Sequence, residues 1–151
     1  MGGSHGGFLT GWLISQPRPQ ERSWKGGCMI NAVTDMSQMV SITDIQDWVY
    51  VESGLPLYST SDTSLHTMWS KSPISQVKEV KCEVMVVVGA SDKRVPSTQS
   101  YAYYQALKRE GKKVSMYKYP NAGHAISDLE QEADYLIHSF LFFQSQWNNK
   151  A

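Results

Sequence analysis

A serine, an aspartate and a histidine stand in this sequence where nucleophilic catalysis would need them. Ser4 lies in the pattern Gly2-x-Ser4-x-Gly6, which is typical of a nucleophile elbow, the tight turn in which a strand ends and a helix begins. We expect glycines there because a side chain on either flank would collide with the strand or the helix. The turn would expose the serine hydroxyl, and the following helix would offer backbone N–H groups that stabilise negative charge.

The aspartate and the histidine each follow a predicted strand. The run 82–89 is continuous, apolar and rich in valine, which is typical of a strand buried on both faces of a parallel sheet, and Asp92 comes just after it. Residues 114–119 predict a second strand, with His124 in the loop beyond. Since parallel strands end at one edge of their sheet, Ser4, Asp92 and His124 are expected to meet there. Their order along the chain is that of the α/β-hydrolase triad.

Each of these side chains has a chemical role in such an arrangement. A serine hydroxyl is a weak nucleophile at neutral pH, so His124 would take the proton of Ser4 and later return it to the leaving group. Asp92 would hold the imidazole in the required tautomer and stabilise its cation. The backbone N–H of His5 would form half of an oxyanion hole.

Less specific interpretations exist for each residue. The opening GGSHGG could be a flexible linker or tag. Asp92 precedes Lys93 and could be a solvated loop carboxylate, and a lone loop histidine such as His124 is often structural. The side chains of His5 and His66 are expected on the surface.

The remaining elements alternate in a way that positions these residues. A helix is predicted after the elbow, a buried strand within 24–33, a broken helix over 35–52 and a short helix near 65–69. A helix that Ser97 would cap carries Tyr101, Tyr104 and Leu107 and ends at Gly111. A long amphipathic helix follows Ser127, which forms a capping-box pattern with Glu130. Alternating strands and helices predict an α/β fold with about three parallel strands flanked by helices, around Cys28, Val86 and Met116.

Composition excludes several other classes of function. The 14 basic and 14 acidic residues balance, so neither nucleic acid nor a membrane surface is expected as a partner. The sequence has no apolar run long enough to span a membrane and no signal-peptide pattern. Cys28 and Cys82 are read as buried thiols of a reducing cytoplasm, although a disulfide between them is an alternative. The four histidines show no metal-ligand spacing, and we expect neither a metal nor a cofactor.

Several segments resemble the acylaminoacyl-peptidase branch of the prolyl oligopeptidase family of serine peptidases. They are GGSHGGFLTGWLISQ, TDIQDWVYVESGLP, KSPI, GASDKRVP and YPNAGHAISDLE, and the resemblance covers nearly all 151 residues. It implies the C-terminal half of an α/β-hydrolase catalytic domain, with Ser4 as nucleophile, Asp92 as orienting acid and His124 as base. It also implies release of an N-acylated, usually N-acetylated, amino acid from a blocked peptide.

The sequence departs from this family in two places. Ile30-Asn31-Ala32 stands where the family typically reads Arg-Asn-Pro, which bears on substrate binding if that arginine holds the substrate. Family members also carry a β-propeller and several sheet strands before the elbow, and these, including the strand that should lead into Ser4, are expected to be absent here. We therefore interpret residues 1–151 as a truncated catalytic domain with an exposed sheet edge.

Two classes of function follow from the resemblance. One is a serine peptidase acting on acylated peptides, with low activity unless the missing half of the domain is supplied by a longer chain or a partner. Either pairing with that missing half or assembly into a homo-oligomer is expected of it. The other is a non-catalytic remnant that binds a full-length homologue through the open sheet edge. A related dipeptidyl peptidase or esterase would differ from the first only in substrate.

Overall fold

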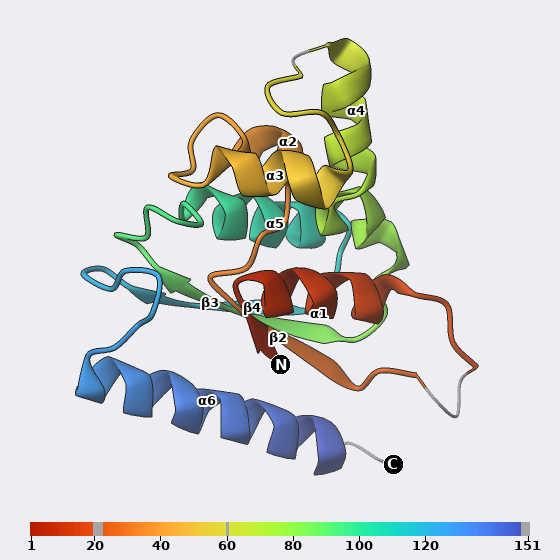
Figure 1. Ribbon diagram of the computed structural model, residues 1–151. Helices are drawn as coiled ribbons and strands as arrows, with labels where there is room; N and C mark the ends of the chain where they lie inside the picture. Colours follow the sequence, from red (N-terminus) through yellow and green to blue (C-terminus); the bar gives the residue numbers. More distant parts are fainter. Residues whose placement is uncertain (20–22, 60, 149–151) are drawn as a thin grey trace.

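One parallel sheet organises the protein. Figure 1 shows the computed structural model, which describes residues 1–19, 23–59 and 61–148. Within these residues the sheet has four strands in the order β1 (Gly2–Gly3), β2 (Gly26–Ile30), β3 (Glu83–Gly89) and β4 (Val114–Tyr119). All neighbouring pairs are parallel, as expected from the alternation of strands and helices. The three predicted strands are confirmed.

The first strand corrects the expectation that no strand leads into the elbow. Gly2 pairs with Met29 and Gly3 with Ile30, so a short piece of strand joins the edge of β2 directly before Ser4. The backbone N–H of Ser4 continues this pairing by donating to the Ile30 carbonyl at 2.9 Å. Two residues of strand are therefore enough to attach the elbow to the sheet.

Helices cover both faces of the sheet, and the valine run of β3 is buried between them. Figure 1 shows α1 (His5–Ser15) and α5 (Thr98–Arg109) on one face and α6 (Leu129–Asn148) on the other. Val84, Val86 and Val88 belong to the core beneath α1 and α5, whereas Met85 and Val87 belong to the core beneath α6. Successive side chains of a strand point to opposite faces, which is why an unbroken apolar run suits this position.

An outer layer of short helices lies beyond α1 and α5 (Figure 1). It consists of α2 (Met36–Met39), α3 (Gln46–Ser53) and α4 (Asp62–Ser70), whereas the 3₁₀ helix η2 (Pro73–Glu79) packs against α1 and α5 and adds Val77 to the core above the sheet. The first two are the predicted broken helix. A second core, with Met36, Met39 and Val49 fully buried, joins this layer to Phe8 of α1. Residues of this layer also form one wall of the cavity beside Ser4 that is described below.

Of the two predicted serine caps, Ser97 occupies the N-cap position without a capping side-chain bond, and Ser127 does not occupy that position. The Ser97 side chain makes no capping hydrogen bond, because its backbone already has helical φ and ψ of −55° and −20°. In the same helix, Tyr103 rather than its neighbours Tyr101 and Tyr104 is fully buried. The last helix begins two residues after Ser127, and the carboxylate that accepts from its first turn belongs to Asp128, which bonds Gln131 N–H at 3.1 Å. An aspartate next to a serine can take the capping position from it.

The long helix α6 leaves much of its apolar surface uncovered. Leu136, Ile137, Phe140 and Leu141 are 44%, 58%, 66% and 51% exposed, and Ser139 is its one buried residue. Most of the apolar side chains of α6 therefore face away from the sheet. Among the described residues, no helix is long and apolar enough to cross a membrane.

Candidate active site

Ser4 occupies a strained turn between β1 and α1. Its φ of 55° and ψ of −122° lie outside the regions that most residues adopt, as the nucleophile-elbow pattern predicts. The Ser4 carbonyl accepts from Gly7 N–H and Phe8 N–H at 3.0 and 3.1 Å, which starts the helix immediately after the turn. The surrounding structure thus holds the hydroxyl at the exposed corner of the elbow.

Of the two glycines predicted to be required in the elbow, Gly2 is required and Gly6 is not. A Cβ on Gly2 would lie 2.2 Å from the Gly6 carbonyl oxygen, so the expected collision is present on that side. A Cβ on Gly6 would meet nothing within 4 Å, whereas one on Gly7 would lie 2.4 Å from Cβ of Ala32. The close approach of α1 to the segment after β2 therefore requires Gly7 rather than Gly6.

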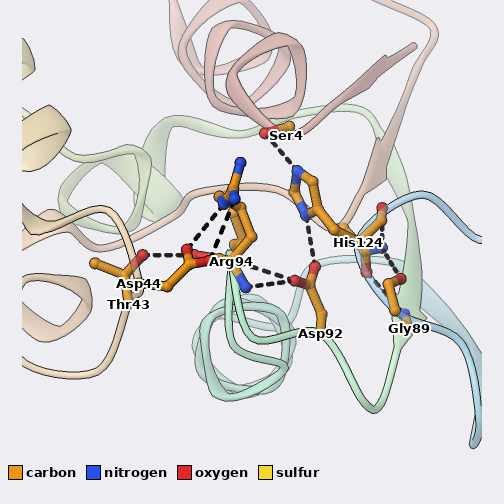
Figure 2. A network of polar contacts seen from close by, with 10 residues as sticks. Ser4, Thr43, Asp44, Gly89, Asp92, Arg94 and His124 are labelled. Carbon is orange, nitrogen blue, oxygen red and sulfur yellow. Dashed lines mark hydrogen bonds and ion pairs between the residues drawn. The ribbon is translucent and has the colours of Figure 1, made fainter.

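The structure brings together Ser4, Asp92 and His124, which are far apart in the sequence (Figure 2). Nε2 of His124 lies 3.0 Å from Oγ of Ser4, and Nδ1 of the same ring lies 2.7 Å from Oδ2 of Asp92. All three follow the carboxyl ends of strands, because Ser4 follows β1, Asp92 follows β3 and His124 follows β4. This continuous chain of polar contacts can pass a proton from a serine hydroxyl to an imidazole whose other nitrogen is held by a carboxylate.

The loop after β3 holds the Asp92 carboxylate rigidly. Its side chain is completely buried, and its Oδ1 accepts from Arg94 N–H at 2.9 Å and from Val95 N–H at 3.0 Å. The Arg94 side chain turns the other way and forms a two-pronged ion pair with Asp44, at 2.8 and 3.2 Å (Figure 2). The Arg94 guanidinium lowers the pKa of Asp44, and Asp44 raises that of Arg94. Asp92 is therefore not the solvated loop carboxylate of the alternative interpretation.

The sequence predicts the His5 side chain on the surface, but in the structure this side chain packs against other residues. It stacks on Phe8 and meets the edge of Trp48, and its Nε2 lies 3.1 Å from Oε1 of Glu52. The ring thereby links the elbow to α3, although 46% of its side chain stays exposed. As the first residue of α1, His5 also has a backbone N–H that the helix does not use. His66, by contrast, is exposed and stacks on Trp69.

A small, largely apolar cavity of about 130 Å³ adjoins Ser4 and His124. Side chains of the outer helical layer and of the two neighbouring loops form its walls: Val33, Met39, Ile45, Trp48 and Val95, with His5 and Arg94 at its rim. Sequence reasoning did not single out these wall residues, because they come from four separate segments and share no local pattern. The matching segment TDIQDW contains two of them, Ile45 and Trp48, which is the one signal that could have found them.

Ile30 lies away from this cavity. It is partly buried in the core beneath α6, together with Cys28 and Met85, and it is not among the residues that line the cavity. Ile30, which stands where the family typically reads arginine, therefore faces α6. The side-chain amide of Asn31, the next residue, contacts the loop that carries His124.

Within the described residues, no three histidine, cysteine, aspartate or glutamate side chains gather as a metal site would require. Both cysteines are free and buried, so they are not joined in the alternative disulfide. Burial raises the pKa of Cys28 and raises that of Cys82 to about 11, so both thiols are in the protonated, apolar form at neutral pH.

The parallel sheet, the strained serine turn and the polar chain at the strand ends place the protein in the class of α/β-hydrolases. More narrowly, it belongs to the prolyl oligopeptidase family, whose model matches residues 1–150. This confirms the family resemblance seen in the sequence motifs.

Relatives in this family are acylamino-acid-releasing enzymes. The enzyme of Rattus norvegicus is 39% identical in an alignment 150 residues long, which covers 96% of this chain and 20% of the rat enzyme. The human enzyme is 36% identical in an alignment 148 residues long, which again covers 96% of this chain and 20% of that enzyme. The chain therefore spans about a fifth of the length of these relatives.

Solved structures agree with this assignment. An acylaminoacyl peptidase from Pyrococcus horikoshii superposes with a TM-score of 0.71 at 25% sequence identity, over 83% of this chain and 19% of that one. A puromycin hydrolase superposes with a TM-score of 0.81 over 97% of this chain and 21% of its own, but at 16% identity it supports the fold alone.

Proposed function

We propose that residues 1–151 carry the catalytic residues of a serine peptidase that releases an N-acylated amino acid from the front of a blocked peptide. The observation that carries this proposal is the polar chain from Ser4 Oγ through the His124 ring to Asp92, with contacts of 3.0 and 2.7 Å. Similarity to acylamino-acid-releasing enzymes at 36–39% identity supports the substrate class. The predicted cytoplasmic location remains part of the proposal.

Acyl transfer would proceed through these residues in two halves. His124 takes the proton of Ser4 as the hydroxyl attacks the substrate carbonyl, and Asp92 stabilises the imidazolium that forms. The proton then passes from His124 to the amine of the leaving peptide, and water repeats the sequence to release the acylated amino acid. The contacts in which His124 takes part already have the lengths that these transfers need.

Negative charge on the carbonyl oxygen would be stabilised at the start of α1. The His5 N–H is one donor for this oxyanion. In α/β-hydrolases the second donor comes from a loop after an earlier strand, which residues 1–151 do not include. Loss of one donor typically lowers kcat by about 10²–10³. We therefore expect the chain by itself to react slowly.

The apolar cavity favours an amino acid with an uncharged side chain as the released residue. Its walls include Met39, Ile45 and Trp48, and burying apolar substrate surface against them contributes binding free energy. Arg94, which also lines the cavity, is paired with Asp44. A dipeptidyl peptidase would instead need a carboxylate to bind a free terminal amine, and the described residues that line the cavity include none.

The test is covalent labelling of the purified chain with a fluorophosphonate, located by mass spectrometry. We expect one adduct on Ser4, which is lost in Ser4→Ala and slowed in His124→Ala. A folded chain that never labels at Ser4 refutes catalysis by these residues alone. Substrate class is tested by mixing the chain with N-acetylated and free-amine anilides, of which the acetylated ones are expected to be cleaved.

A second candidate is the non-catalytic one, in which this domain binds a full-length homologue through its open sheet edge. The exposed apolar residues of α6, led by Phe140 at 66%, leave further surface for such a partner. The two candidates differ in a sizing experiment with a full-length homologue whose own nucleophile is replaced by alanine. Formation of a complex without labelling at Ser4 would support binding alone, and labelling of Ser4 accelerated by the complex would support the peptidase.

A further inference from the structure

Asn31 connects the carboxyl end of β2 with the carboxyl end of β3 and with the loop that follows β4. It follows the last residue of β2, is 2% exposed and has a φ of 43°, a left-handed conformation that asparagine tolerates better than most residues. Its backbone N–H donates to the Val87 carbonyl at 2.9 Å, which extends the pairing of β2 with β3 by one residue. The backbone of Asn31 is thereby fixed before its side chain is considered.

The oxygen and the nitrogen of the Asn31 side-chain amide both form hydrogen bonds with backbone groups, which belong to two other segments. Oδ1 accepts from Gly89 N–H, the last residue of β3, at 2.7 Å. Nδ2 donates to the carbonyls of Gly123 and His124 at 3.2 and 2.9 Å. Because an N–H lies on one side and two carbonyls on the other, only one orientation of the amide satisfies all three partners.

This contact fixes the main chain of the loop that presents His124. Gly89 permits the close approach, since a Cβ there would lie 2.4 Å from the Gly123 carbonyl oxygen. The neighbouring backbone bond from Ser91 N–H to the Ala122 carbonyl, at 2.9 Å, holds the same loop against the end of β3. Asp92 orients the His124 ring, whereas Asn31 holds the backbone on which that ring is mounted.

We propose that Asn31 is a positioning residue, which sets the distance between the His124 ring and Ser4 by tying the His124 backbone to the end of β2. The proposal rests on the proposed function in one respect, that the Ser4–His124 contact is the reacting one. Asn31 itself touches neither Ser4 nor the imidazole, and it does not line the cavity. A shift of about 1 Å in a reacting group costs about 10²-fold in rate, so the loss of this amide should be visible in the chemistry.

Two substitutions separate this role from a general effect on folding. Asn31→Asp keeps the shape, the left-handed backbone and the acceptor for Gly89, but places a second oxygen against two carbonyls. Asn31→Gly keeps the left-handed backbone and removes the amide. Asn121→Asp is the matched control, because it places the same charge on an exposed asparagine of the same loop.

The first readout is the rate of fluorophosphonate labelling at Ser4, divided by the folded fraction from urea unfolding. We expect about a 10²-fold loss in Asn31→Asp and Asn31→Gly, and no change in Asn121→Asp. Rates of the folded fraction equal to wild type in both Asn31 variants would overturn the proposal, because Asn31 would then act on stability alone.

The second readout is independent of catalysis, so it distinguishes this proposal from the proposed function. Isotope-labelled histidine and NMR of the neutral imidazole report which nitrogen of His124 carries the proton. With the loop held, Asp92 keeps the proton on Nδ1, and the two Asn31 variants should show a mixture of tautomers. An Nδ1–H tautomer in every variant, or a mixture already in wild type, would overturn the proposal even if no chain labels at Ser4.

Discussion

The carboxylate of Asp92 lies 2.7 Å from Nδ1 of His124 and is completely shielded from solvent, although 32% of the His124 side chain is exposed. This asymmetry follows from how each side chain is held. Two backbone N–H groups occupy Oδ1 of Asp92, which leaves Oδ2 for His124. The ring can therefore exchange protons at its open side while its inner nitrogen keeps one partner.

Replacing Asp92 by asparagine should leave the fold intact and remove most of the reactivity of Ser4. The amide presents either an N–H or a neutral oxygen to Nδ1, so the imidazole loses the anion that fixes its tautomer. In an unrelated serine protease the same change lowers kcat about 10⁴-fold. We expect a loss of labelling rate of the same order, measured by mass spectrometry over time. The exposed Asp62, changed to asparagine, is the control, and equal losses in both variants would contradict a specific role for Asp92.

The two glycines after Ser4 should respond in opposite ways to alanine. Gly7→Ala forces a Cβ to within 2.4 Å of Ala32 Cβ, so it should lower the free energy of unfolding by about 1–3 kcal/mol. Gly6→Ala enters open space inside a helix, where alanine is favoured over glycine by about 1 kcal/mol. Urea unfolding of both variants measures the difference. A destabilised Gly6→Ala with a neutral Gly7→Ala would show that the helix packs differently.

Stability should fall in mildly alkaline solution because of Cys82. Burial raises the pKa of this thiol from its ordinary value of 9.0 to about 11. Between these values the unfolded chain releases the proton and the native chain retains it, so the native state binds more protons and the free energy of unfolding decreases as pH rises. Cys82→Ala cannot titrate there, so the difference between its unfolding free energy and that of wild type should shrink from pH 8 to pH 10.5. Curves that stay parallel would contradict ionisation of Cys82 as the cause. Cys28 is present in both chains and cancels.

The exposed face of α6 should make the isolated chain prone to self-association. Ile137 and Phe140 are 58% and 66% exposed and lie three residues apart on a helix, so they form part of one apolar surface. Changing both to glutamate should keep the chain monomeric at concentrations where wild type forms larger species, as measured by sedimentation velocity. Val51→Glu, on α3 at a site that is 71% exposed, should have no such effect. Identical sedimentation of wild type, the double variant and Val51→Glu would contradict self-association through the exposed surface of α6.

Elements with strong local patterns could be predicted from the sequence. The valine run of β3 predicted a strand buried on both faces, and the apolar periodicity of α6 predicted an amphipathic helix. Both patterns are formed by residues that are close together in the sequence. Caps were less predictable. Ser97 and Ser127 have the right residue type, but the capping geometry depends on where the chain enters the helix, and Asp128 competes directly with Ser127.

The sequence by itself determined the serine turn, the order of Ser4, Asp92 and His124, and the location of Asp92 and His124 after strands, because each depends on a short motif or a strand end. The tertiary structure decided the rest. The Asn31 contacts and the pairing of Arg94 with Asp44 join residues 50 or more positions apart, and the walls of the cavity come from four separate segments. No local pattern specifies such contacts, since they form only when the sheet sets neighbouring strand ends side by side and the outer helices pack above them.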